Sequence, residues 1–226
     1  MSKNEMLDLM GKGGRRMWFG ALAALGLLVF VLACATVAEP PTGAFKADLE
    51  FPPPGTKWVY RTVDHTGTTT TATYTVIEEG IYEGKPAFRV SDGVNLLIYD
   101  KVTRNWVATL REGKERFSAS PNDGAFSSPL WVGKSWIARY SYNDRVRGRT
   151  FNIIEYWWKV EAYEDVKVPA GTFKAFRLEG SNPYASTTLW YAPEAKLIIK
   201  RVFERASTSY LGYGKFTTEL LEYPAK

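Results

Sequence analysis

The sequence predicts an all-β protein, folded as an antiparallel sandwich or an incomplete barrel. Three observations support this fold class. Segments rich in Val, Ile, Thr, Tyr and Trp, with apolar side chains at alternate positions, follow one another from Thr56 onward. No segment after Cys34 carries a convincing apolar stripe at the 3.6-residue period of a helix. Eight Trp, thirteen Tyr and twelve Phe residues supply large side chains for a core.

Residues 1–33 have the pattern of an export signal. Basic residues, including the pair Arg15-Arg16, precede the uncharged run 17–33, which ends in small side chains. The basic pair also resembles a twin-arginine signal. The run is slightly short for a membrane span of about 20 residues, although reading on to Ala38 would complete one. The segment therefore predicts either a signal peptide or a membrane segment.

Cys34 is the only cysteine, so a disulfide within the chain is excluded. The residues Val31-Leu32-Ala33-Cys34 resemble a bacterial lipobox, in which the cysteine is acylated and becomes the new N-terminus. The resemblance implies lipidation at Cys34, and Ala35 at the next position implies an outer-membrane lipoprotein facing the periplasm or the cell surface. Two alternatives stay open, namely an uncleaved membrane anchor and ordinary cleavage near Ala38. All three export the rest of the chain.

The remaining chain divides into a tether and one β domain. Residues 34–55 begin with the lipidated cysteine and are rich in proline and small residues, which predicts a flexible, extended tether. The β domain covers 56–226. The formal net charge of +5 is small and its charges are interspersed, so no nucleic-acid partner is expected.

The first half of the domain reads as a series of short strands. Asp92-Gly93 is a strong hairpin-turn signal between two of them. Turn residues fill Ser118–Lys134, which predicts a long loop. The expected strands are Lys57–Thr62, Thr70–Glu78, Ala87–Ser91, Val94–Asp100 and Asn105–Leu110.

A long strand over Thr150–Tyr163 separates two adjacent tryptophans. Trp158 shares a face with apolar residues, so it is predicted to be core, as are Trp58 and Trp136. Trp157 lies among charged residues on the opposite face, where a large indole is uncommon without a partner.

Two copies of one β-unit are indicated, at 56–118 and 131–223. Trp58, preceded by Gly55, is echoed by Trp136, preceded by Gly133. Two longer echoes follow in the same order: Thr73–Gly93 with Trp157–Gly180, and Leu96–Leu110 with Thr188–Val202. The alternative is that strand sequences simply look alike.

Two motifs in the second half carry a family resemblance. Val168–Phe173 reads VPAGTF, and Leu189–Pro193 reads LWYAP. Together they resemble a family of uncharacterised bacterial secreted proteins and envelope lipoproteins, some described as TapB-like domains of unknown function. The resemblance covers roughly Leu130–Thr208 and implies a β-rich envelope protein without a known catalytic residue. As residues, Pro169 and Gly171 fit a type I turn.

The sequence carries no recognisable catalytic motif, and no enzyme activity is expected. His65 is the only histidine, so neither a metal site nor a cofactor is predicted. Four glutamates could form a carboxylate pair of the kind that cleaves sugars, although each fits the solvent face of a strand. They are Glu78, Glu79, Glu155 and Glu161.

The predicted function is binding at a membrane. Trp157, Trp190 and Tyr191 exceed the aromatic residues that one buried face requires, so they are the candidate ligand-binding residues. The expected partner is a lipid, a glycan or a protein of the cell envelope, bound between the two β-units. The alternatives are a purely structural or assembly lipoprotein without a small ligand, and a carboxylate-dependent hydrolase. The oligomeric state is left open.

Overall fold

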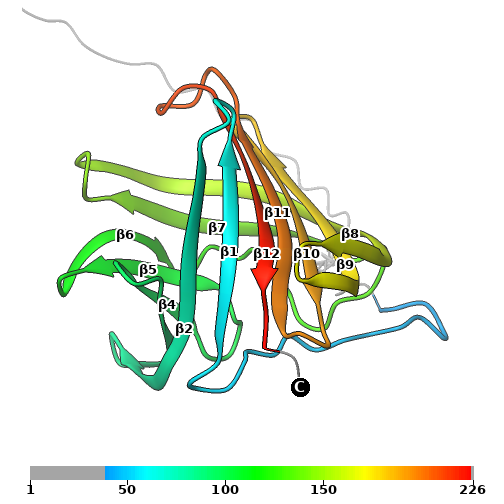
Figure 1. Cartoon of the computed structure of the whole chain (residues 1–226). Coiled ribbons are helices and arrows are strands. Elements are labelled where there is room, and N and C mark those ends of the chain that lie inside the picture. Colours follow the sequence, from blue (N-terminus) through cyan, green and yellow to red (C-terminus); the bar gives the residue numbers. More distant parts are fainter. Residues whose placement is uncertain (1–38, 225–226) are drawn as a thin grey trace, which may run out of the picture. The chain divides into compact units, whose positions relative to one another are not determined.

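The computed structural model describes residues 39–224, so the predicted signal and Cys34 lie outside the described part. Every regular element in that part is a β-strand (Figure 1). The strands are β1 Lys57–Asp64, β2 Thr69–Tyr82, β3 Lys85–Ser91, β4 Leu96–Asp100, β5 Trp106–Arg111, β6 Lys114–Ser120, β7 Ser135–Asp144, β8 Arg149–Val168, β9 Gly171–Asn182, β10 Ala185–Ala192, β11 Leu197–Arg205 and β12 Gly214–Glu222. Within 39–224 there is no helix long and apolar enough to cross a bilayer.

The strands form one antiparallel sheet that closes into a barrel. Each strand pairs with its neighbours in sequence, and β1 pairs with both β2 and β12. The all-β antiparallel class is thus confirmed, and the barrel is closed rather than incomplete. Closure is favourable because it leaves no strand edge with unpaired N–H and C=O groups.

The hairpin of β8 and β9 is long enough to bend over the sheet. Its tip buries Val166 and Val168 in one apolar cluster with Ile199 and Leu220. The Ala170 N–H also donates to the Leu220 carbonyl at 3.1 Å. In Figure 1 this tip curls in front of β10. The VPAGTF motif therefore forms a hairpin turn, as its residues predict, and that turn packs against β11 and β12.

The segment before β1 differs from the predicted tether. Ala47 and Leu130 exchange two backbone hydrogen bonds of 3.1 and 2.8 Å, and Leu49 is only 6% exposed. Phe51 stacks on Phe88 of β3 with ring centroids 4.7 Å apart. Residues 45–55 thus pack against the barrel because their apolar side chains meet partners far away in sequence. Of the predicted tether, residues 34–38 fall outside the described part.

A second segment fills the gap where β6 and β7 separate. These strands pair only over Phe117–Ser120, and the loop that follows returns to the inside of the barrel. The Asn105 side chain donates to the Phe126 carbonyl at 3.0 Å and accepts from the Phe126 N–H at 2.8 Å. Gly124 has a φ of 61°, and a Cβ there would lie 2.6 Å from that of Ala138. We call Pro121–Pro129 the plug loop.

The predicted repeats correspond to β1–β6 and β7–β12, and their pairing matches in detail. Gly55 donates to the Val76 carbonyl at 2.7 Å, and Gly133 donates to the Val160 carbonyl at 2.8 Å. One cross-strand aromatic pair also recurs, as Phe88 with Tyr99 and as Phe176 with Tyr191. These equivalent positions favour a duplication, which stays a prediction.

Ala38–Lys226 form a compact unit by themselves. The closed pairing leaves no edge strand, and the three apolar clusters are built from residues of this unit. A domain that begins at Ala38 therefore contains the core and the strand pairing that its fold requires.

Candidate functional site

Two arginines on β11 point into the barrel. Arg201 pairs with Leu189, which is buried in the core, and cross-strand partners share one face of a sheet. Phe203 and Arg205 follow at alternate positions and so share that face. On β12 their partners are Thr218, Phe216 and Gly214. We call Arg201, Phe203, Arg205, Phe216 and Thr218 the arginine wall.

The arginine wall faces inward, yet water reaches it. Arg201 is exposed, and Phe203, Phe216 and Thr218 are only half-buried. Other parts of the inner face are packed, for example around Trp58 and Val76. Because packed interiors leave few voids, the exposure of an inward-facing arginine means that this part of the barrel is not filled by protein side chains.

The side chains of the wall stack in order. The Arg201 guanidinium carbon lies 5.2 Å from the Phe203 ring centroid, and that of Arg205 lies 5.3 Å from the Phe216 centroid. The two rings stack on each other at 6.3 Å. Gly214 leaves room for Arg205, because a Cβ there would crowd the guanidinium. The result is two cations held against aromatic faces, an arrangement that attracts anions while offering apolar surface beside them.

Neither cation has a carboxylate partner. No ion pair within 4.0 Å involves Arg201 or Arg205 in residues 39–224, and the buried Arg205 Nε has no hydrogen-bond partner. Arginines on the opposite, outer face of the same sheet are paired. Arg61 on β1 contacts Glu219 at 3.0 Å, and Arg177 on β9 contacts Glu164 at 3.2 Å. The inner cations therefore retain capacity to bind an anion.

The charge of Arg201 acts on four tyrosine side chains from different strands of the barrel. Burial raises the pKa of Tyr74 on β2, Tyr99 on β4, Tyr140 on β7 and Tyr156 on β8, and Arg201 opposes that rise in each case. These residues come from four separate strands, so the charge of Arg201 acts across the interior of the barrel. The inner face thus combines this cation with several phenols, which offer apolar surface and hydroxyl groups together.

The plug loop adds a carboxyl group to the same space. Burial raises the pKa of Asp123 to about 6, against the lowering effects of the Ala125 N–H, Arg201 and the Trp106 N–H. Asp123 Oδ1 accepts the N–H of Trp106 at 3.1 Å and that of Ala125 at 3.4 Å. Its hydrogen bonds therefore hold the loop in place, and its charge acts on Arg201 only over a distance greater than that of an ion pair.

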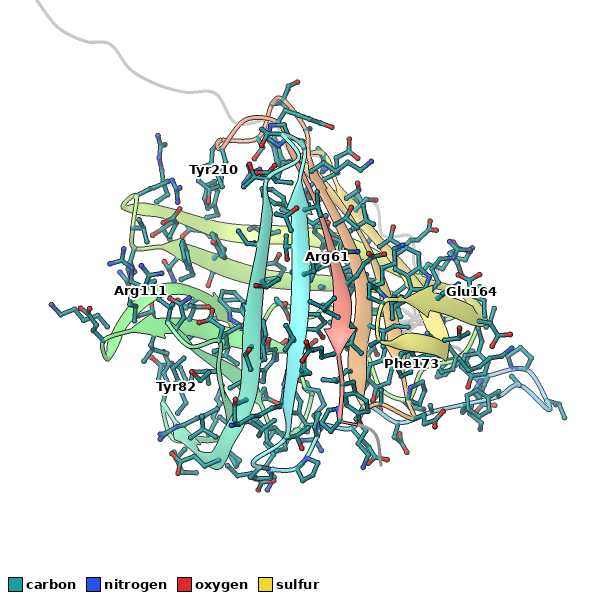
Figure 2. All side chains as sticks on the ribbon, in the orientation of Figure 1. Arg61, Tyr82, Arg111, Glu164, Phe173 and Tyr210 are labelled. Carbon is teal, nitrogen blue, oxygen red and sulfur yellow. The ribbon has the colours of Figure 1, made fainter. Side chains whose placement is uncertain are left out.

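A loop ties down the rim next to the arginine wall. Tyr210, between β11 and β12, donates its hydroxyl to Asp144 Oδ2 on β7 at 3.1 Å. Arg147 contacts the same oxygen at 3.1 Å, and Asp144 is fully buried. Figure 2 shows Tyr210 reaching from its loop toward β7. The loop that follows Arg205 is thereby fixed to the opposite wall of the barrel.

The aromatic residues predicted to bind a ligand are not brought together. Trp157 is half exposed on the outer face of β8. Trp190 lies on the outer face of β10, where its Nε1 donates to Glu164 at 3.0 Å. Tyr191 points inward and is buried, and its hydroxyl bonds to the Glu50 backbone. The three residues therefore form no common surface.

Sequence reasoning missed the arginine wall, although a signal for it was present. In Arg201–Arg205, alternate positions read Arg, Phe, Arg, which is unusual for a strand face that meets a core. Such a face is easily assigned to solvent, because nothing local shows that the sheet closes around it.

The four candidate carboxylates lie on the outer face of the barrel, and each forms an ion pair with an arginine or a lysine. Glu78 contacts Arg89 at 2.7 Å and Glu155 contacts Arg139 at 2.7 Å. The other two pairs are Glu79 with Lys101 and Glu161 with Lys159. His65 sits in the β1–β2 turn against the Tyr213 ring. In the described part of the chain, no group of three or more His, Cys, Asp or Glu residues is placed to hold a metal.

Two surface pockets lie apart from the arginine wall. One of about 170 Å³ lies between Tyr82 and Glu115, whose side chains hydrogen-bond across it. Figure 2 labels Tyr82 at this place. The other, about 330 Å³, lies beside Phe51 and the following prolines, and its lysines are paired with glutamates. The hydrogen bond in the first pocket and the ion pairs in the second use part of their polar groups within the protein.

No family model and no curated protein matches this chain. The hypothetical lipoprotein YmcC from Escherichia coli aligns with a TM-score of 0.40 and 9% identity, over 77% of this chain and 91% of that one. An exported protein with a YmcC-like fold from Bacteroides fragilis aligns with a TM-score of 0.39 and 12% identity, over 79% of this chain and 100% of that one. The TapB-like resemblance stays a prediction.

Proposed function

We propose that this chain is an exported, membrane-anchored protein whose non-catalytic barrel binds a lipid against its inner face. One observation carries the proposal: Phe203 and Phe216 face into a closed barrel and are still reached by water. Exposed apolar surface in a concave, protected place is the usual form of a site for an apolar ligand.

The anchor is proposed at Cys34, on the lipobox-like residues before it. Each buried methylene of an acyl chain contributes about 0.8 kcal/mol, so one chain holds weakly and several hold firmly. An outer-membrane destination is proposed from Ala35. The prediction is that globomycin, which blocks lipoprotein signal cleavage, makes the precursor accumulate, and that Cys34→Ser abolishes incorporation of labelled fatty acid. Normal processing of the wild type in globomycin and of the Cys34→Ser variant would reject lipidation. An uncleaved anchor and ordinary cleavage near Ala38 would then remain.

A lipid fits the inner face better than the other predicted partners. The rings of Phe203 and Phe216 offer apolar surface that an acyl chain can cover, whereas a sugar would need hydrogen bonds to its hydroxyl groups as well. A protein partner would need an accessible flat surface, whereas these rings lie inside the barrel. Nearby Thr62 and Thr218 bond to each other through their hydroxyls at 2.9 Å, which uses part of their capacity for an outside ligand.

The binding prediction uses the domain 38–226 and a neutral lipid, monodecanoylglycerol. Trp106 pairs with Tyr99 across β4 and β5 and shares its face, so part of the tryptophan emission comes from the inner face. We expect a saturable fluorescence change, and about tenfold weaker binding in Phe203→Ala, because that variant loses apolar contact area. Trp157→Ala is the matched control on the outer face and should bind as the wild type does.

Three other outcomes have distinct meanings. Saturable binding of maltohexaose that Phe203→Ala weakens would favour a glycan ligand. Lipid binding lost in Trp157→Ala but retained in Phe203→Ala would return the site to the outer face. No saturable binding of either ligand would reject the proposal and favour a structural or assembly lipoprotein.

A further inference from the structure

We propose that the arginine wall binds the anionic headgroup of an amphiphile, with Arg201 contacting the carboxylate or phosphate. This inference rests on the proposed function and names the ligand class for the same inner face. It predicts that the charge of the headgroup, rather than chain length alone, selects the ligand.

Neither cation of the arginine wall has an acidic partner within the described residues. The Arg205 Nε is buried without a hydrogen-bond partner, and an unpaired charge away from bulk water is costly. On the outer face, Arg61 and Lys200 both contact Glu219 at 3.0 Å (Figure 2 labels Arg61). Lys200 and Arg201 are adjacent in sequence, yet only the outward side chain has an acidic partner. The inward arginine is thus left with five donors for a ligand.

The Asp123 carboxyl group of the plug loop is not an ion-pair partner of Arg201. The charge of Arg201 lowers the pKa of Asp123, but the two groups form no ion pair within 4.0 Å. Asp123 Oδ1 is already used by the backbone N–H groups of Trp106 and Ala125. Arg201 therefore stabilises the charge of Asp123 without contacting it, and the N–H donors of Arg201 stay free.

The apolar surface of the arginine wall lies beside both cations. Phe203 and Phe216 lie between the two guanidinium groups. A headgroup at Arg201 would place the first carbons of its chain beside these rings. Arg205 adds a second cation on the same face, so a phosphate monoester with more than one negative charge would also fit.

The test compares four probes on domain 38–226 by titration calorimetry: decanoate, decyl phosphate, decanol and inorganic phosphate. We expect both anionic amphiphiles to bind at least about tenfold more tightly than decanol, a difference of about 1.4 kcal/mol. Inorganic phosphate should bind much more weakly than decyl phosphate, because it lacks the chain. Arg201→Gln should remove the preference for anions, measured as the ratio of the decanoate and decanol dissociation constants. Arg201→Lys should retain part of the preference, because it keeps the charge and loses the planar fork.

The matched control is Arg61→Gln, on the outer face of the neighbouring wall, which should keep the wild-type preference. Equal affinity for decanoate and decanol, or an anion preference that survives Arg201→Gln, would overturn the inference while leaving lipid binding in place. Equal affinity for inorganic and decyl phosphate would also overturn it, since the chain would then contribute nothing. Failure of all three decyl probes to bind would instead reject the proposed function itself. Circular dichroism spectra that match the wild type ensure that a loss reflects binding.

Discussion

Replacing Trp158 with alanine should destabilise the barrel far more than replacing its neighbour Trp157. Trp158 is 6% exposed and Trp157 is 50% exposed. The buried ring stacks on Trp136, with centroids 6.3 Å apart, and Gly180 on the next strand leaves room for it. Removing a buried tryptophan typically costs about 3–5 kcal/mol. For a domain of this size, such a loss lowers Tm by roughly 10 °C.

The Trp157→Ala variant is the matched control, because both substitutions remove the same side chain from the same strand. Its cost should stay within about 1 kcal/mol, as for other surface positions. Thermal unfolding of both variants followed by circular dichroism measures the difference. The buried Trp158 Nε1 has no hydrogen-bond partner, so the variant is also relieved of one unsatisfied polar atom, which lowers its cost within that range. Equal losses would show that both faces of β8 are covered.

Replacing Asp123 with asparagine should stabilise the protein at neutral pH and change little in acid. Burial raises the Asp123 pKa from an ordinary 3.8 to about 6, against smaller lowering effects. The folded carboxyl therefore holds its proton more tightly than the unfolded one. Below about pH 4 the carboxyl group is protonated in both states and costs no stability. Its cost grows as the pH rises from 4 to 6 and is complete above about pH 6. Two pKa units correspond to about 3 kcal/mol, which is an upper limit for this half-buried group.

Asparagine keeps the Oδ1 atom that accepts the Trp106 and Ala125 N–H groups, so the plug loop should hold its position. The measurement is urea unfolding of both proteins at pH 4 and pH 7.5. Asp165→Asn, an exposed position in β8, serves as the control and should stay within about 0.5 kcal/mol of the wild type. A gain of equal size at both pH values, or a loss at pH 7.5, would contradict the prediction.

Local pattern was a reliable guide where the geometry is itself local. Side chains alternate between the two faces of any strand, so the neighbours of Trp158 were enough to predict that it is buried and that Trp157 is not. Trp58 is buried as predicted, whereas Trp136 is half-buried at the start of β7, where its Nε1 donates to the Gly124 carbonyl of the plug loop.

Local pattern was a poor guide where contacts join distant residues. Composition made 34–55 a tether, yet Leu49 is buried and Phe51 stacks on Phe88. Proline-rich chains are extended, and an extended chain can still lie across a surface when its apolar side chains find a complementary one. Trp190 and Tyr191 are adjacent in sequence and face opposite sides of the sheet, so an aromatic cluster in the sequence did not become a cluster in space.

By itself, the sequence determined the all-β class, the faces of the long strand β8 and the turn character of its motifs, because all of these depend on neighbours in the chain. Only the tertiary structure decided that β1 meets β12, and that meeting turns one face of β11 into the inside of a barrel. Arg201, Asp123 and the tyrosines around them are far apart in sequence, and they share one space only because of that closure. A local sequence pattern cannot reveal residues that act together across a closed sheet. Whether a strand face lies inside or outside depends on how the whole sheet closes.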